Sequence, residues 1–571
     1  MFRVFLSITL TFFTLSCSKT RTITVDKYID KMKGGWVGQM VGVGWGGPTE
    51  FQSQGTILPL EKIPDWKPNM VNQYYQDDIY VEMTFLATLE KNGFDVSIRQ
   101  AGIDFANSRY MLWHANKAGR DNLRSGIAPP YSGYPAYNAH ADDIDYQIEA
   151  DYSGLIAPGM PQVVIDLGNK FGRLMNYGDG LYGGLFVGGM YAEAFFENDI
   201  VKIIEAGLAC IPAESQYAEC IRDVLRWHEQ NPGNWKKTWE LINNKYQLNP
   251  EYRKFSCSGP RDKFNIDAKI NGAYIVTGLL YGNGNPDSTI IISTRCGQDS
   301  DCNPSSAGGI LFTSVGFSNL PERFTSAIDT VPKFSYTEYN AASLINVCTK
   351  LARLAIVRSG GRIEKGTDGK ELFIIPVAAP VIGTLEQCWS APAVTEEVGF
   401  TQEEMKQIKF RSRPKDDFVV TWQVSGPYMK GNLTAQELLD VKFAPETEQK
   451  SAVEWRKMPV SGSEVIDLSK DPGGDNRVAY LRNRIWSESG RQVIMETGSD
   501  DGIKIWINGE LVHTNNVVRG LSNSEDKIKI TLKQGWNDCL MKISQGGGGW
   551  GASVCFVDPD TNETIKDLKF E

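Results

Sequence analysis

Two short acidic motifs carry side chains of the kind that bind hard metal ions in proteins. The first contains Asp77 and Asp78 at the beginning of an apolar-faced segment, and the second, residues 296–304, contains Asp299 and Asp301. Carboxylate oxygens are the ligands that Mg²⁺, Mn²⁺ and Ca²⁺ prefer. If the fold brings the two motifs together, the four aspartates supply the ligands of one site for such a cation.

Each motif taken alone has a simpler explanation. Asp77 and Asp78 precede residues 79–89, which have helical periodicity, and Asp301 precedes Pro304, a residue favoured in the first turn of a helix. Aspartates are common at helix N-termini because they cap free N–H groups and interact favourably with the helix dipole. Sequence spacing does not bring the motifs together by itself, so helix capping stays an alternative.

Two further segments in the middle of the chain have a polar composition that suits a binding site. Residues 142–151 hold five carboxylates with apolar residues between them, so we expect some of these carboxylates to face inward rather than to form a solvated surface. Residues 176–184 are rich in glycine and tyrosine and can line a sugar subsite or form a tight connection between helices. Tyr177, Asp179 and Tyr182 are therefore candidate substrate-binding residues.

The elements that must position these residues divide the chain into a helical part and a β-rich part. Helical periodicity extends over roughly residues 25–360, whereas alternating, strand-like runs follow the charged linker 409–417. The Asn508-Gly509 pair is a strong hairpin signal. We therefore predict a multidomain protein, an all-α domain followed by an all-β, jelly-roll-like sandwich.

The motifs together resemble those of the ADP-ribosylglycohydrolase family. That family usually has Thr-Asp-Asp-Thr near its start and Gly-Gly-Asp-Thr-Asp-Thr near its end, at positions that match residues 76–79 and 297–302. Residues 34–51, which include Glu50, are similar to the opening helix of the family, and residues 151–159 resemble its central glycine-rich segment. The order and spacing agree across roughly residues 25–358.

The resemblance implies a hydrolase whose all-α catalytic domain covers residues 24–360. It places Asp77, Asp78, Asp299 and Asp301 as metal ligands. Glu50, Asp78 and Asp299 are then expected to be catalytic. Asp151 joins the candidate substrate-binding residues.

The sequence departs from the family pattern at two positions. Gln76 stands where the family usually has its first threonine ligand, and Cys302 stands where it has its last. A glutamine can still bind through its amide oxygen, but the sulfur of cysteine matches a hard cation poorly. We therefore predict one divalent cation, Mg²⁺, Mn²⁺ or Ca²⁺, and no ligation by Cys302.

The ends of the chain indicate export and an accessory module. Residues 1–17 read as a signal peptide of a bacterial lipoprotein with Cys17 as the lipidated residue, although an ordinary cleaved signal peptide is an alternative. This predicts a periplasmic or outer-membrane protein that contacts the membrane only through its lipid. Residues 361–413 read as an extension and linker, and residues 414–571 resemble the accessory sandwiches of secreted glycosidases. Carbohydrate binding by this module is a hypothesis, and a purely supporting role for the catalytic domain is the alternative. Trp550 can contact a sugar or can equally be a buried strand start.

The net charge and the cysteine spacing argue against certain binding partners and metal sites. The 571 residues carry a formal net charge of −10, which argues against a nucleic-acid-binding surface. The chain has ten cysteines; apart from Cys17, they have no disulfide-framework or zinc-ligand spacing, so we expect most of them to be buried as small apolar residues.

These features favour an exported glycoside hydrolase that cleaves a carbohydrate, in particular a furanoside. The alternatives are an ADP-ribosyl hydrolase that keeps the activity of the family and a sugar-binding lipoprotein whose metal site has decayed. Export and the sandwich module argue against ADP-ribose, since ADP-ribosylated proteins are mostly cytoplasmic. The presence of all four aspartates argues against decay.

Overall fold

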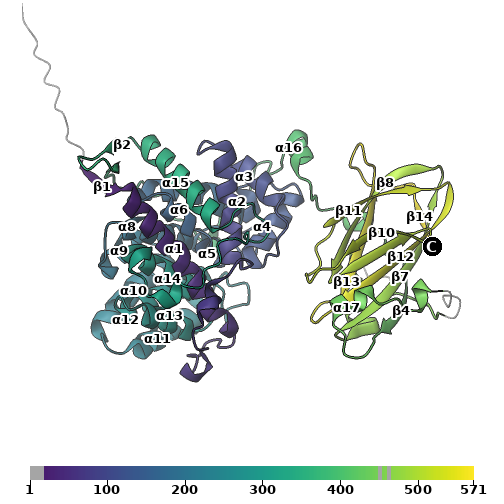
Figure 1. Cartoon of the computed structure of the whole chain (residues 1–571), viewed down its shortest axis with the longest axis horizontal. Coiled ribbons are helices and arrows are strands. Elements are labelled where there is room, and N and C mark those ends of the chain that lie inside the picture. The colour runs from purple at the N-terminus through teal and green to yellow at the C-terminus, as the bar shows by residue number, and fades with distance from the viewer. Residues whose placement is uncertain (1–18, 448–452, 460–463) are drawn as a thin grey trace, which may run out of the picture. The chain divides into compact units, whose positions relative to one another are not determined.

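The computed structural model describes residues 19–447, 453–459 and 464–571, so the predicted export segment with Cys17 lies outside the described residues. The described chain forms two compact units (Figure 1). The first consists of the described residues up to Phe105 together with residues 112–120 and 128–398. The second consists of residues 106–111, 121–127 and 399–571.

The first unit is helical, as predicted (Figure 1). Residues 79–89, for which the sequence predicts helical periodicity, fall within a helix of the structure. The α-helices over this part of the chain are α1 (Val25–Gly46), α2 (Asp77–Asn92), α3 (Ile98–Ala106), α4 (His114–Arg124), α5 (Asp145–Ile148), α6 (Asp151–Leu155), α7 (Pro161–Phe171), α8 (Asp179–Ala194), α9 (Ile200–Leu208), α10 (Gln216–Gln230), α11 (Trp235–Ile242), α12 (Ala268–Gly282), α13 (Pro286–Arg295), α14 (Cys302–Val315) and α15 (Ala341–Arg358).

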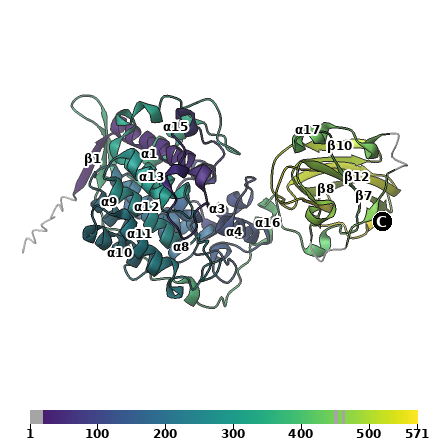
Figure 2. The same ribbon diagram turned by 90° about the horizontal axis from the view of Figure 1, so that it is seen from below.

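Helix α1 is buried along most of its length and packs mainly against α14. Figure 2 also shows it beside α13 and α15, both of which contact it. Glycines recur every fourth residue on the face of α1 that meets α14, at Gly34, Gly38, Gly42 and Gly46. A Cβ atom at Gly42 would lie 2.2 Å from the carbonyl oxygen of Pro304. The two backbones therefore touch, which only glycine permits.

A three-stranded sheet lies at the start of the helical unit, in the order β1-β3-β2 (Figure 1). Its strands are β1 (Thr20–Thr24), β2 (Arg362–Lys365) and β3 (Glu371–Pro376). Thr22 pairs with Ile374 in the antiparallel β1–β3 ladder. Strand β3 thus returns the chain after α15 to the segment that precedes α1.

The second unit contains two antiparallel sheets, as expected for a sandwich. The larger sheet has the order β10-β9-β12-β7-β4-β5, with β14 also paired to β7, and the smaller has the order β11-β8-β13-β6. The strands of the larger sheet are β4 (Gln423–Tyr428), β5 (Arg456–Lys457), β7 (Arg477–Ser487), β9 (Ile503–Ile507), β10 (Glu510–Asn515), β12 (Gly535–Gln545) and β14 (Lys569–Phe570). Those of the smaller sheet are β6 (Ile466–Asp467), β8 (Arg491–Asp500), β11 (Asp526–Leu532) and β13 (Gly551–Val557). The short helices are α16 (Gln402–Gln407) and α17 (Ala435–Asp440).

Side chains of both sheets share one apolar core. Strand β11 alternates between buried and exposed residues, as a strand with one face on the core must. The predicted hairpin at Asn508-Gly509 is present, and both residues have positive φ. Trp550 is only 3% exposed within this core and directly precedes β13, so of its two alternatives the buried strand start is confirmed and the sugar contact is not. Among the described residues, no helix is long and apolar enough to cross a membrane.

The glycine contact between α1 and α14 yields a stability prediction. Gly42→Ala forces a methyl group against the backbone at Pro304, and overpacking of this kind costs about 1–3 kcal/mol, or more where backbone must move. We expect Gly42→Ala to lower the free energy of unfolding by at least about 2 kcal/mol in urea titrations. Gly233→Ala, where a Cβ meets no atom within 4 Å, is the matched control. Equal stability of the two variants would contradict the close contact.

Candidate active site

The two acidic motifs, which are far apart in the sequence, meet in the helical unit. Ligand atoms of Asp78, Asp301 and Cys302 all lie within 4.8 Å of one another, and the same holds for Glu50, Asp299 and Asp301. Asp301 belongs to both groups. The structure therefore places the catalytic and metal-binding candidates in one cluster, which we call the acidic cluster, made of Glu50, Asp77, Asp78 and the two aspartates of the second motif.

The ends of three helices bring these residues together. Glu50 follows the C-terminal end of α1, whereas Asp77 and Asp78 form the first turn of α2, and Asp301 is the residue before α14. Thr49 and Ser300 join the first and last of these segments, with their hydroxyl oxygens 3.0 Å apart. Because α1 and α14 are in backbone contact, the residues that follow α1 must lie beside those that precede α14.

Helix capping accounts for only part of this arrangement. The N-cap positions of α2 and α14 are Gln76 and Asp301, and neither makes a side-chain cap hydrogen bond. Asp299 accepts a long hydrogen bond of 3.4 Å from the backbone N–H of Cys302. The buried Oδ1 atom of Asp78 has no hydrogen-bond donor among the residues that the structure describes. Several carboxylate oxygens are thus left for another partner.

The acidic cluster concentrates negative charge in a largely buried place. Asp78, Asp299 and Asp301 are at most 4% exposed. Burial and the charges of neighbouring carboxylates raise the pKa of Asp299 to about 7 and hold the pKa values of Asp78 and Asp301 well above their usual range. Glu50 is open to solvent on one side, yet partial burial and the charges of Asp301 and Asp77 raise its pKa to about 8.

This donor set fits a hard divalent cation. Clustered carboxylates disfavour their own ionisation, and a cation removes that penalty while using oxygen ligands. The Sγ atom of Cys302 lies 3.3 Å from Oδ2 of Asp78 and 3.8 Å from Oδ1 of Asp301. Burial and the aspartate charges raise the pKa of this thiol well above its usual range, so it remains a neutral donor to the carboxylates. The expectation that Cys302 binds no metal stays a prediction.

A second layer of polar residues supports the acidic cluster from α1, α2, α6 and α8. Gln39 donates through Nε2 to Glu82 (2.7 Å), to Asp151 (2.8 Å) and, at 3.2 Å, to the carbonyl of Asp78. Tyr191 also donates to Asp151, at 2.7 Å. Asp151 is 1% exposed, and burial raises its pKa to about 8. Its contacts lie within the protein, and substrate binding by Asp151 stays a prediction.

Glu82 is a residue of this layer that the sequence analysis missed. It is fully buried and accepts from the backbone N–H of Tyr152 at 2.7 Å. Its position one helical turn after Asp78 was the available signal, because residues four apart share one helix face. Its place beside Gln39 and Asp151 has no local signature in the sequence.

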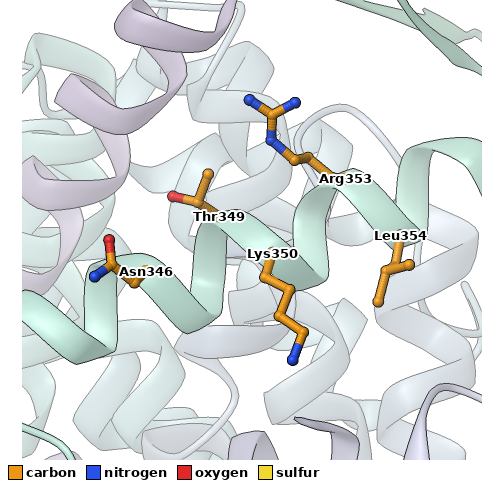
Figure 3. Close-up of a pocket in the computed structure, with 5 residues that line it drawn as sticks. All are labelled: Asn346, Thr349, Lys350, Arg353 and Leu354. Atoms are coloured by element: carbon orange, nitrogen blue, oxygen red, sulfur yellow. The ribbon is translucent and has the colours of Figure 1, made fainter.

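The other substrate-binding candidates, Asp179, Tyr182 and Tyr177, contact residues that do not belong to the acidic cluster. Asp179 forms a buried ion pair with Lys269, with Oδ2 and Nζ 3.3 Å apart. The hydroxyl oxygen of Tyr182 accepts from the backbone N–H of Glu386 at 2.7 Å. Tyr177 packs in a small apolar group with Cys388. Figure 3 shows an open depression formed by one face of α15, and no predicted site residue lines it.

The carboxylate charges predict a distinctive dependence of stability on pH. The pKa of Asp299 is raised on folding, so its ionisation destabilises the metal-free protein increasingly between about pH 4 and pH 7, by up to about 4 kcal/mol. We expect Asp299→Asn to melt several degrees above the wild type at pH 8 in chelator, and near it at pH 4. Mg²⁺ should raise the melting temperature of the wild type and of the control variant, but not that of Asp299→Asn. The exposed Asp95→Asn variant is the control, and parallel pH profiles for Asp299→Asn and wild type would contradict this account.

The family-model comparison agrees with the resemblance seen in the sequence. A family model for ADP-ribosylglycohydrolase matches residues 24–358. A solved structure described as an ADP-ribosylglycohydrolase-related protein complex is similar over 58% of this chain and 99% of its own, with 13% identity and a TM-score of 0.38. A β-glucosidase from Kluyveromyces marxianus matches 25% of this chain and 16% of its own, with 13% identity and a TM-score of 0.17. No curated protein gives a significant match. Since the family model covers more than half of the sequence, the chain belongs to the ADP-ribosylglycohydrolase family, a family of hydrolases.

Proposed function

We propose that this protein is an exported, metal-assisted glycoside hydrolase that cleaves a furanoside bond in a carbohydrate. The observation that carries the proposal is the convergence of Glu50 with the aspartates of both acidic motifs. Glycoside hydrolysis needs carboxyl groups that differ in protonation and flank the reacting carbon. Members of this family typically use divalent metal ions, and the acidic cluster has the oxygen donors that such ions require.

The side chains of the acidic cluster divide the acid and base roles by their surroundings. Glu50 is the exposed member, and its raised pKa of about 8 keeps it protonated near neutral pH in the metal-free chain. In this position it can donate a proton to the leaving oxygen. Asp299, with a pKa of about 7, is suited to accept a proton from the attacking water. A bound cation would lower both pKa values and hold vicinal hydroxyl groups of the sugar.

Asp78 and Asp301 hold the cation in this proposal, with Asp77 beside them. Asp301 is common to both groups of candidate ligands, which makes it the centre of the arrangement. We propose one ion, because Cys302 replaces an oxygen donor on the side of Asp78. Mg²⁺, Mn²⁺ and Ca²⁺ all suit the donor set.

The choice of a carbohydrate over ADP-ribose depends on features outside the acidic cluster. The first seventeen residues read as an export signal, and the second unit, which contains two antiparallel β-sheets, resembles in sequence the modules attached to secreted glycosidases. We propose a lipoprotein of the periplasm or outer membrane whose substrates are glycans. Membership of the family favours the second candidate, release of ADP-ribose from a protein or small molecule.

A substrate screen separates these candidates. Purified protein is incubated with Mg²⁺ and a panel of plant and host glycans, and separately with ADP-ribosylated protein. We expect release of a sugar from a furanoside glycan and loss of at least about 100-fold in kcat for Asp299→Asn and Glu50→Gln, as removal of acid–base groups costs 10²–10⁴-fold. Asp95→Asn should retain full activity. Release of ADP-ribose alone would overturn the carbohydrate proposal, and no turnover of either class would favour a binding protein.

A second experiment tests the position where this chain departs from its family. Because a neutral thiol donates to the carboxylates without binding a hard ion, Cys302→Thr should leave activity with Mg²⁺ equal or improved. Cys302→Ala should cost less than about tenfold, the loss of one modest hydrogen bond. A large loss in Cys302→Ala, with Zn²⁺ giving the highest wild-type activity, would identify the thiolate as a ligand.

A further inference from the structure

A second group of metal-ligand side chains lies in the helical unit and shares no residue with the acidic cluster. It consists of His114, His140, Asp143 and Cys257, and one ligand atom from each lies within 4.8 Å of all the others. His114 is the first residue of α4, whereas His140 and Asp143 precede α5. Cys257 lies in the long segment between residue 252 and α12. Three separate parts of the chain thus meet at this point.

The contacts within the group centre on the Asp143 carboxylate. Oδ2 of Asp143 lies 2.7 Å from Nδ1 of His140 and 3.5 Å from Nδ1 of His114. Asp143 is fully buried, and its Oδ1 atom has no hydrogen-bond donor among the residues described. The two histidines and Cys257 are partly exposed, which leaves a route for an ion from solvent.

The donor types distinguish this group from the acidic cluster. Two imidazoles, a thiol and a carboxylate are the ligands of zinc and related transition metals, and are a poor match for Mg²⁺ or Ca²⁺. In a tetrahedral zinc site with bonds of 2.0–2.3 Å, neighbouring ligand atoms lie about 3.3–3.8 Å apart. The separation of 3.5 Å between Asp143 and His114 falls in that range, the 2.7 Å between Asp143 and His140 is shorter, and all the ligand atoms lie within 4.8 Å of one another, so side-chain movements of about 1 Å suffice to form the site.

We propose that His114, His140, Asp143 and Cys257 bind one Zn²⁺ ion as a four-ligand site. Binding replaces the S–H bond of Cys257 with a sulfur–zinc bond and releases the proton to solvent, with no oxidation or reduction. All four positions of the ion are taken by protein, which is the pattern of structural zinc sites. The sequence analysis found no zinc-ligand spacing because the four residues span residues 114–257 without a short motif.

Cys257 differs from the other cysteines in a way that suits this role. Of the nine described cysteines, eight are buried and Cys257 is partly exposed. A metal ion deprotonates a coordinating thiol directly, so a partly exposed thiol beside two imidazoles and a carboxylate suits a ligand role.

A zinc ion bound by this group would hold in place a chain segment that lies beside the acidic cluster. The segment that carries Cys257 continues to Phe264, whose ring stacks on His114 with centroids 5.7 Å apart and contacts Phe51 at 5.2 Å. Phe51 directly follows Glu50 in the chain. The next residue, Asn265, donates its backbone N–H to the side chain of Gln298 at 2.9 Å. Zinc at this position therefore holds a segment that contacts Phe51 and Gln298, the chain neighbours of Glu50 and Asp299 in the acidic cluster.

Metal content tests the proposal without reference to activity. The full chain is stripped with chelator, titrated with Zn²⁺ alone and analysed for bound metal. We expect one tightly held zinc per chain in wild type. Cys257→Ser and His140→Ala should weaken it by more than about 100-fold, since even changes outside the ligands cost 10–100-fold. His228→Ala, a histidine outside the group, and Asp299→Asn, in the acidic cluster, should keep wild-type affinity.

Two further measurements guard against a variant that fails to fold. Co²⁺ bound to the wild type should show the thiolate-to-cobalt charge-transfer absorption, and this band should be absent from the folded Cys257→Asp variant, which keeps an oxygen ligand. Zn²⁺ should also protect Cys257 from alkylation. Unchanged zinc affinity in Cys257→Ser, a cobalt complex without the charge-transfer band, or alkylation of Cys257 at the same rate with and without Zn²⁺ would each overturn the proposal.

Discussion

The backbone contact between α1 and α14 is the constraint on which the candidate site depends. Gly34, Gly38, Gly42 and Gly46 face Phe312, Gly308, Pro304 and Ser300 in turn, so the two helices run antiparallel at the closest distance that the chain allows. Any side chain on this face would separate them. The contact fixes where α1 ends relative to where α14 begins, and so it sets Glu50 beside Asp301.

This rigid frame allows the molecule to hold charges that would otherwise move apart. Carboxylates at the starts of α2 and α14 repel one another, and burial increases the cost of their ionisation. The polar layer behind them is built from the amide of Gln39, which donates to two acidic side chains and one carbonyl. A neutral donor holds Glu82 and Asp151 behind the acidic cluster without placing a positive charge there that would compete with a cation for its aspartates.

The acidic pairs and the helical and β-rich halves could be predicted from the sequence, because each has a local signature of period, composition or motif. Glu82 and the His114 group could not, since their meaning depends on contacts across the fold. Trp550 shows the same limit, because a glycine-rich stretch before a tryptophan is compatible with both an exposed loop and a buried strand start. Strand β4 begins at Gln423, although Val419 and Trp422 before it are also buried in the core, and Val419 donates its backbone N–H to Val554 of β13.

The two groups of ligands differ in chemistry for a reason that the fold makes plain. The acidic cluster lies at helix starts, where carboxylates gain from the helix dipole and where oxygen ligands for a hard cation accumulate. The His114 group combines the first residue of α4 with side chains from two segments between helices. Phe264 contacts His114 on one side and Phe51 on the other. The two groups share no ligand, so two cations of different hardness can bind near each other without competition. The ring of Phe264 contacts a residue beside each group and so connects the two segments.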